Sequence, residues 1–135
     1  RIAGTGATLV TCPRSNTWVG VGAPPIARFL ASGVRLAIGT DSLASAPDLN
    51  VFAELAELRR LAPEAPARRL LAAATVGGAE ALGLGAEFGT IEVGRRAELV
   101  VVDAAGVADP EEAMVQGLDA TRVRPWRPSG NAGGH

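Results

Sequence analysis

Two short apolar runs near the start of the chain have the pattern of buried strands. Residues 7–11 (ATLVT) lie between Gly6 and Pro13, and residues 34–38 (VRLAI) end at a Gly-Thr-Asp-Ser turn. Apolar residues at helical spacing over 25–32, begun by a proline and followed by a glycine, predict a helix between them. A strand, a helix and a strand with short joints form a parallel pair with a right-handed crossover. The pattern therefore predicts an α/β fold.

Helical periodicity continues through the middle of the chain. Leucine and phenylalanine repeat at helical spacing over 48–62, which predicts an amphipathic helix with Asp48 as its N-cap. Two further helices are expected over 66–73 and 77–82, the second of them capped by Thr75. The charged residues of the first helix are interpreted as its solvated face, without a catalytic role: Glu54, Glu57, Arg59 and Arg60.

The remaining segments either contain turn residues or lack periodicity. Residues 13–25 carry prolines, glycines and a Ser-Asn pair, and they are predicted to form a shaped loop. Two short strands around a turn are predicted over 91–93 and 99–102, and a short helix over 110–116. Residues 124–135 are rich in proline, arginine and glycine, and we expect them to form a disordered tail.

The composition supports a packed core and gives no sign of a highly charged partner. Of the 135 residues, 47% are hydrophobic and 20% are charged, which excludes a disordered chain. The 13 basic and 14 acidic residues leave a net charge of -1, so we expect neither a nucleic acid nor an anionic membrane as partner. Because the chain shows no apolar leader and no apolar span, we expect a cytoplasmic protein.

The chain holds one cysteine, Cys12, and one histidine, His135. An intramolecular disulfide, a Ser-His-Asp triad and a histidine metal site therefore cannot be built from these 135 residues alone. Cys12 is interpreted as a small buried hydrophobe. Because the first residue is Arg1 rather than methionine, we expect the chain to be a piece of a longer protein.

Five motifs follow one another along the chain in a fixed order. They are CPRSN at 12–16, GAPP at 22–25, GTDS at 39–42, a group of AT, GA and ALG over 74–83, and GTI followed by GRRA over 89–97. Together the motifs resemble the C-terminal part of amidohydrolase-superfamily enzymes. Within that superfamily they are most similar to the branch of chlorohydrolases and aminohydrolases that includes S-adenosylhomocysteine, guanine and aminodeoxyfutalosine deaminases. Residues 39–61 are similar in particular to the aminodeoxyfutalosine deaminases.

This resemblance implies an α/β fold class: the C-terminal fragment of a metal-dependent (β/α)8 TIM barrel that leads into part of a small β-sandwich domain. Residues 1–86 would supply the last two barrel strands with their helices, and residues 87–123 part of the composite sandwich. Residues 124–128 (RPWRP) stand where the last sandwich strand, with an apolar-glycine pattern, would be expected. Completion of the sandwich is therefore left open.

The same resemblance implies a hydrolase of non-peptide carbon–nitrogen bonds that depends on a divalent metal. In the family, histidines from the first, fifth and sixth barrel strands and an aspartate ending the eighth hold this metal, and only Asp41 has a match here. Zinc is the expected metal, with iron, manganese or nickel as alternatives. Asp41 would ligate it and accept a proton from the attacking water. The implied reaction is deamination of a purine-like or other N-heterocyclic small molecule, with aminodeoxyfutalosine as one candidate.

Four further residues are candidate substrate contacts, and each has a plainer alternative. Ser15 and Asn16 would shape the pocket or only stabilise a turn. Trp18 would stack on a flat heterocycle or simply cover the barrel mouth, and Arg14 would pair with a substrate anion or with a neighbouring acid. Asp41 has its own alternative as a capping residue of a turn, against which the flanking motifs favour the metal ligand.

Other functions remain open from the sequence. The chain could be a non-catalytic interaction or structural module that keeps a barrel segment, or the product of a truncated gene. If it is part of an enzyme, we expect the fragment to be inactive alone, because a catalytic metal needs several ligands. The parent enzyme would act on a small-molecule substrate without a nucleic-acid or membrane partner, and a homo-oligomeric parent is an open alternative.

Overall fold

The structure is a computed structural model that describes residues 4–127. Its first sheet pairs β1 (Thr8–Thr11) with β2 (Arg35–Ile38) in parallel. Helix α2 (Ile26–Ala31) connects the two strands, and Gly33 ends it at φ +74°, a left-handed conformation that glycine adopts without strain. The predicted parallel strand–helix–strand unit is confirmed.

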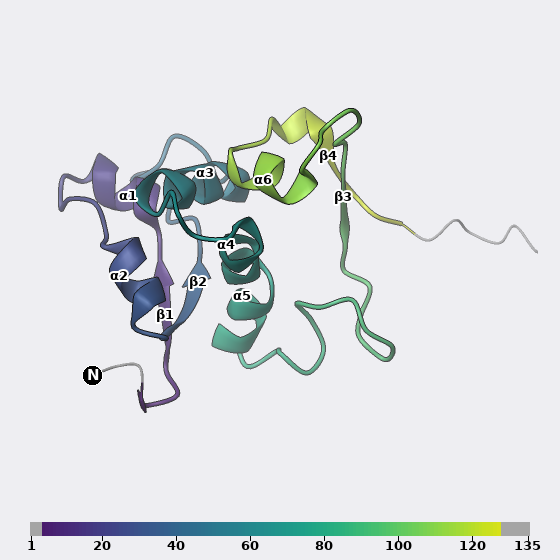
Figure 1. Ribbon diagram of the computed structural model, residues 1–135, viewed down its shortest axis with the longest axis horizontal. Coiled ribbons are helices and arrows are strands. Elements are labelled where there is room, and N and C mark those ends of the chain that lie inside the picture. Colours follow the sequence, from purple (N-terminus) through teal and green to yellow (C-terminus); the bar gives the residue numbers. More distant parts are fainter. Residues whose placement is uncertain (1–3, 128–135) are drawn as a thin grey trace, which may run out of the picture.

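Three helices follow β2: α3 (Val51–Leu61), α4 (Ala67–Ala74) and α5 (Val76–Ala81). All three contact β2, and together with α2 they enclose one core (Figure 1). The buried side chains of this core are Ile26, Leu30, Leu36, Ile38, Leu55, Leu58, Ala62, Leu70, Ala73 and Val115. The last of them comes from α6 (Pro110–Val115), a helix far along the chain. Within residues 4–127, no helix has both the length and the apolar character needed to cross a membrane.

Residues 13–18 form a helix where the sequence predicted a loop. Helix α1 (Pro13–Trp18) has Pro13 at its first position. Proline suits this position because its φ is already helical and its missing N–H would have no partner within the helix. Pro13 therefore starts a helix, and the irregular segment is confined to the residues after it, where Gly20 and Gly22 adopt positive φ.

The caps of two helices differ from the prediction. Helix α3 is capped by Asn50, whose Oδ1 accepts from the Phe52 backbone N–H at 3.0 Å. Asp48, the predicted cap, lies two residues earlier, and its carboxylate binds an arginine of α1 instead. Thr75 precedes α5, but its hydroxyl donates back to the Leu71 carbonyl oxygen at 2.9 Å and does not cap that helix.

The prediction of one solvated face on α3 holds for only half of its charged residues. Glu57 and Arg60 pair on the surface, one turn apart, at 2.6 Å. Glu54, in contrast, is fully buried. The Arg59 guanidinium pairs with Glu112 of the C-terminal segment at 2.6 Å. It also donates to two carbonyl oxygens of the α3–α4 loop. The interpretation is therefore wrong for Glu54 and Arg59, because both find partners outside their own helix.

Two side chains, one in α3 and one at its N-cap, fasten the C-terminal segment to the helices that cover β2. Arg59 holds Glu112 in the first turn of α6. From the opposite end of α3, the Asn50 side-chain amide donates to the Leu118 carbonyl oxygen at 3.3 Å. Val115, between these two contacts, is fully buried. Both ends of α3 thus hold residues 112–118.

The C-terminal segment also forms a second, two-stranded sheet. Strand β3 (Val100–Val102) pairs antiparallel with β4 (Val123–Pro125), which follows the 3-10 helix η2 (Ala120–Arg122). Strand β4 includes the first two residues of the predicted disordered tail. The expectation of disorder is therefore wrong for those two residues, which pair with β3, and also for Trp126, whose backbone N–H donates to the Leu99 carbonyl oxygen at 2.8 Å. Residues 128–135 lie outside the described residues.

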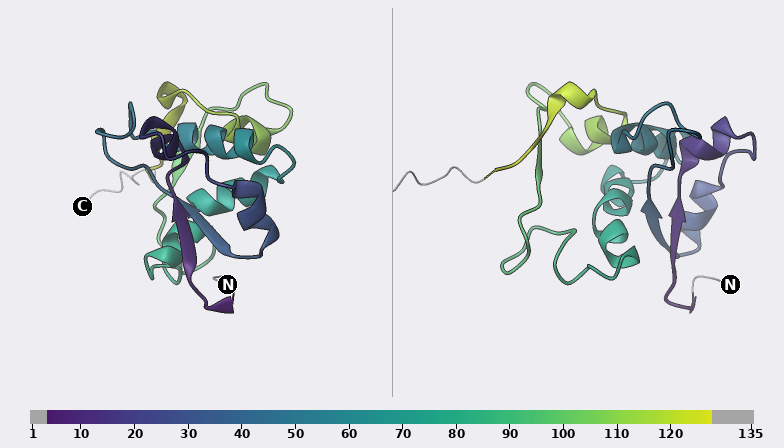
Figure 2. Two further views of the ribbon diagram at one scale, coloured as in Figure 1. Left: turned by 90° about the vertical axis from the view of Figure 1, so that its left-hand side faces the viewer. Right: turned by 180° about the vertical axis from the view of Figure 1, so that it is seen from behind.

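The second predicted strand pair is only half formed. Residues 100–102 are a strand, but residues 91–93 have no strand neighbour in the described part of the chain and their side chains are exposed. A strand forms only where a neighbour binds its N–H and C=O groups. Residues 84–99 form a series of turns without helix or strand. Gly89 packs closely against Val76 and Ala79 of α5, and beyond it the chain runs away from the helices (Figure 2). An apolar cavity of about 1,200 Å³ opens between this segment and the helices, lined by residues such as Phe52 and Phe88.

Gly77 lets α5 approach β2 closely. A Cβ at this position would overlap the Leu36 carbonyl oxygen of β2, whereas a Cβ at Gly78, the next residue of the same helix, would meet open space. We expect Gly77→Ala to lower the free energy of unfolding by about 2 kcal/mol or more, because backbone must move to admit the methyl group. Gly78→Ala should be neutral or stabilising by up to about 1 kcal/mol, from helix propensity.

Urea denaturation of the two variants checks this expectation. They differ only in which face of α5 receives the methyl group. Equal stability of the two variants would show that α5 does not pack on β2 as described.

Candidate functional site

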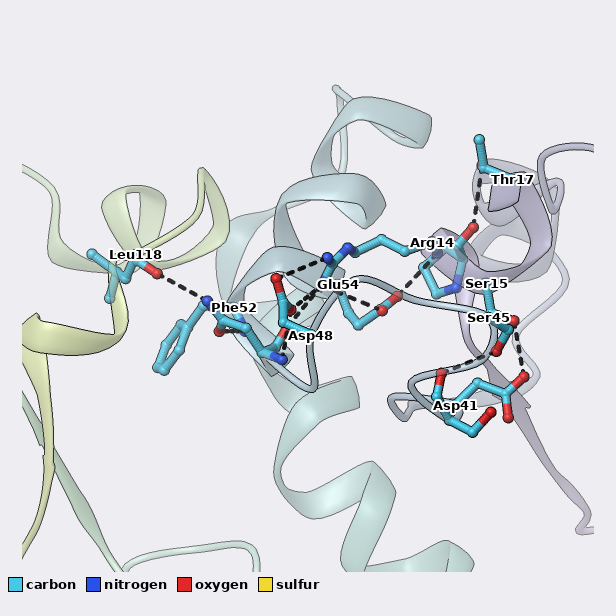
Figure 3. Close-up of polar contacts among 12 residues, drawn as sticks. Arg14, Ser15, Thr17, Asp41, Ser45, Asp48, Phe52, Glu54 and Leu118 are labelled. Atoms are coloured by element: carbon cyan, nitrogen blue, oxygen red, sulfur yellow. Dashed lines mark hydrogen bonds and ion pairs between the residues drawn. The ribbon is translucent and has the colours of Figure 1, made fainter. Parts of the chain in front are cut away.

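Asp41 lies just beyond the carboxyl end of β2, where parallel strands of an α/β fold commonly place catalytic groups. The two strands end in register, with Thr11 beside Ile38, so the residues that follow each strand meet at the same edge. The first turn of α1 therefore faces Asp41, and the Ser15 hydroxyl donates to Asp41 Oδ2 at 2.8 Å (Figure 3). Two of the predicted site residues are thus joined directly.

Hydrogen bonding keeps the Asp41 carboxylate in its charged form. The Ser15 hydroxyl, followed by Ser45 and the backbone of Ser42, holds the pKa of this carboxyl below its ordinary value. Asp41 itself is exposed. An exposed carboxylate that is ionised at neutral pH can bind a cation or accept a proton.

Arg14 is occupied by acidic residues of this chain. Its two terminal nitrogens contact the two oxygens of Asp48 at 2.7 Å and 3.2 Å, a bidentate geometry. The hydrogen bond from Arg14 is also the main reason why the pKa of Asp48 lies below its ordinary value. This geometry favours the ion-pair alternative for Arg14, and a role in substrate binding stays a prediction.

Glu54 is the residue of this region that sequence reasoning missed. It is fully buried, its Oε2 accepts from the Arg14 backbone N–H at 3.1 Å, and its Oε1 lies 3.8 Å from the Arg14 guanidinium. Burial raises the pKa of the Glu54 carboxyl. One signal was present: Glu54 precedes the core residue Leu58 by four positions, a spacing that places both side chains on the same face of a helix.

The other predicted residues make no hydrogen bond or ion pair with Asp41 in the described part of the chain. Asn16 is half-buried in α1, and its carbonyl oxygen accepts from the Val21 N–H at 3.2 Å. Trp18, the last residue of α1, is 64% exposed. Cys12 was predicted to be a small buried hydrophobe, but it is only half-buried; partial burial nevertheless raises the pKa of its thiol, as expected for an unreactive cysteine.

Asp41 can supply one ligand of a metal site. Among residues 4–127, no group of three His, Cys, Asp or Glu side chains comes together in a way that could hold a metal ion. The chemistry of Asp41 nevertheless fits a divalent cation, because it is an exposed, ionised carboxylate at a strand end.

Comparisons with known proteins agree with the motifs. The sequence profile described as "Amidohydrolase family" matches residues 1–125. A 5-methylthioadenosine/S-adenosylhomocysteine deaminase of Halobacterium salinarum is 43% identical over 109 residues, which are 76% of this chain and 25% of that protein. An aminodeoxyfutalosine deaminase of Deinococcus radiodurans is 43% identical over 83 residues, covering 62% of this chain and 20% of that protein.

A solved structure gives the same result for the fold. An adenosine deaminase from Xanthomonas campestris, with bound zinc, superposes with a TM-score of 0.84 and 35% identity, covering 93% of this chain and 31% of that one. The chain thus spans roughly a fifth to a third of the length of these relatives. The predicted resemblance is confirmed, and the first sheet with its helices is an α/β segment of a barrel domain.

Proposed function

Because the chain belongs to the amidohydrolase family, we propose that it forms the C-terminal part of a longer, metal-dependent deaminase that acts on an adenine nucleoside. In this proposal residues 1–86 complete a (β/α)8 barrel and residues 87–123 contribute to a small β-sandwich. Residues 124 and 125, which the sequence assigned to the tail, belong to β4 and join this second part in the proposal. The isolated chain would be inactive, and the other metal ligands would come from residues outside these 135.

The observation that carries this proposal is the contact between Ser15 and Asp41. The two residues belong to motifs 26 positions apart in the sequence, yet their side chains meet at 2.8 Å at the carboxyl edge of the sheet. A turn aspartate would bond only within its own loop, whereas this carboxylate, besides Ser45 and Ser42 of its own loop, also accepts a hydrogen bond from a hydroxyl of the segment that follows the neighbouring strand. Such support from a second element is what a positioned catalytic carboxylate requires.

The chemistry follows from a carboxylate at this position. A divalent metal, when bound, lowers the pKa of a coordinated water and makes it a nucleophile near neutral pH. Asp41 would contribute one ligand and accept a proton from the attacking water. Attack at the ring carbon that bears the amino group forms a C–O bond, and the C–N bond breaks as the amino group leaves as ammonia after receiving a proton. The nucleobase then carries a carbonyl oxygen, derived from water, in place of its amino group.

The substrate class rests on the names of the relatives. 5-Methylthioadenosine, S-adenosylhomocysteine, aminodeoxyfutalosine and adenosine appear in those names, and all carry an adenine base. Zinc is the proposed metal because it is bound in the Xanthomonas campestris structure. Trp18, exposed at the end of the helix that carries Ser15, would stack on the nucleobase or sugar of such a ligand.

An assay of the longer protein tests the proposed function. The purified protein is expected to contain zinc, to release ammonia from at least one of the four adenine compounds, and to lose this activity on chelation and regain it with zinc. Guanine and a chlorotriazine serve as comparison substrates. Turnover of these alone would contradict the adenine assignment, and a folded protein without metal or turnover would favour the non-catalytic module.

A further inference from the structure

The geometry points to Glu54 as a positioning residue that holds the first turn of α1 so that Ser15 can support Asp41. This inference rests on the proposed function, in which Asp41 performs the chemistry. It adds a residue of α3 that would not touch metal, substrate or reacting water. Glu54 would act only through the backbone beside Ser15.

Helix α1 lacks a cap of its own. The first N–H groups of any helix have no partner within the helix and are usually bound by the side chain of the N-cap residue. Cys12 occupies the N-cap position of α1 and makes no side-chain capping hydrogen bond. Glu54 Oε2 instead accepts from the Arg14 N–H at 3.1 Å, although Glu54 lies 40 positions further along the chain. Helix α3 thus supplies the cap of α1.

The burial of Glu54 makes this contact rigid. The side chain is fully buried on the core face of α3, beside Leu55 and Leu58. Among the described residues Oε1 has no hydrogen-bond partner, and it lies 3.8 Å from Nη1 of Arg14, the nitrogen that also contacts Asp48 at 2.7 Å. Breaking the hydrogen bond between Glu54 and the Arg14 N–H would leave a buried N–H without an acceptor, which is costly. The Glu54 side chain is therefore expected to stay in this position.

The contact is one residue away from the site. Ser15 follows Arg14 directly and is itself buried, with its hydroxyl at 2.8 Å from Asp41 Oδ2. If the Arg14 N–H loses its acceptor, the first turn of α1 can shift, and the Ser15 hydroxyl shifts with it. Misplacement of the hydroxyl that supports the catalytic carboxylate is sufficient to reduce turnover. Substrate affinity need not change, because neither Glu54 nor Ser15 is required to touch the substrate.

Three variants in the longer, zinc-loaded protein separate this role from packing and from charge. Glu54→Gln keeps an oxygen that can reach the Arg14 N–H but removes the charge. Glu54→Asp keeps the charge but withdraws the oxygen by one methylene group. Glu57→Gln, the matched control on the same helix, removes only the carboxylate of the surface pair with Arg60. Glu54→Leu replaces Glu54→Asp if the latter does not fold.

Two measurements apply to each variant. We expect Glu54→Asp to lower kcat about tenfold with KM little changed, while Glu54→Gln and Glu57→Gln stay within about threefold of the parent. Hydrogen–deuterium exchange of the amides of residues 14–16 should rise in Glu54→Asp alone. In a Ser15→Ala background, Glu54→Asp should have little further effect on kcat, because the two residues act in series.

The outcomes distinguish the inference from the proposed function. Unchanged exchange in residues 14–16 with Glu54→Asp, or a loss of kcat in Glu54→Gln but not in Glu54→Asp, would overturn the role of Glu54 as a cap. Effects of Glu54→Asp and Ser15→Ala that simply add would overturn the link to Ser15. A parent protein that binds zinc but deaminates nothing would contradict the proposed function, while the exchange data would still decide whether Glu54 holds α1.

Discussion

Replacing Asp41 with alanine is expected to lower kcat of the longer enzyme by about 1,000-fold or more, which corresponds to about 4 kcal/mol of transition-state stabilisation. In the proposed reaction Asp41 is both a metal ligand and the proton acceptor, so its loss removes two contributions at once. Steady-state kinetics with the preferred adenine nucleoside, together with the zinc content of each preparation, provides the measurement.

The matched comparison for this prediction is Trp18→Ala. Trp18 is exposed at the end of α1, and an interaction with substrate there would be equally strong in the ground and transition states, so its loss should raise KM and leave kcat nearly unchanged. If Asp41→Ala retains near-normal kcat with its metal still bound, then Asp41 is only a turn residue. The proposed site would then have to be withdrawn.

The 135-residue chain alone is expected to show no deaminase activity under conditions in which the longer protein turns over its substrate. A single carboxylate provides one of the several ligands that a catalytic metal needs, so the metal would not be held. Without it, the water that attacks the adenine ring would stay protonated at neutral pH. The measurement is ammonia release at equal molar concentrations of the two proteins, with excess zinc supplied to both.

A control makes this negative result meaningful. The Asp41→Asn variant of the 135-residue chain should give the same background as the unaltered chain. Turnover of an adenine nucleoside by the 135-residue chain that disappears with Asp41→Asn would show that these residues contain a complete site, contrary to the proposal.

The helices and strands with a regular apolar pattern were predictable, because their structure depends on residues close in sequence or on pairing with one adjacent strand. Apolar runs of strand length bounded by turn residues gave β1 and β2 within a residue or so, and proline and glycine marked the ends of α2. The meeting of Ser15 and Asp41 followed in outline from parallel strands that end at one edge. These features depend on chain periodicity and on the handedness of the crossover, both of which a sequence carries.

The features that were missed depend on partners far along the chain. Glu54 was assigned to solvent because charged residues usually lie there, but the N–H that it binds belongs to a helix 40 positions earlier. Asp48 has the residue type and position of an N-cap, but nothing near it in the sequence indicates the Arg14 guanidinium that binds its carboxylate. Residues 91–93 have the composition of a strand, yet a strand also requires a neighbour that the described chain does not offer them.

The contacts that hold residues 112–118 against α3 would keep the molecule in one piece after a cut in its backbone. The connection between the helices and this segment runs through residues 84–99, which form turns and contain no helix or strand. A protease that cut the backbone there would not separate the two pieces, because Arg59, Asn50 and the buried Val115 would still hold them together. The nicked protein would migrate as two bands under denaturing conditions and as one species in native buffer.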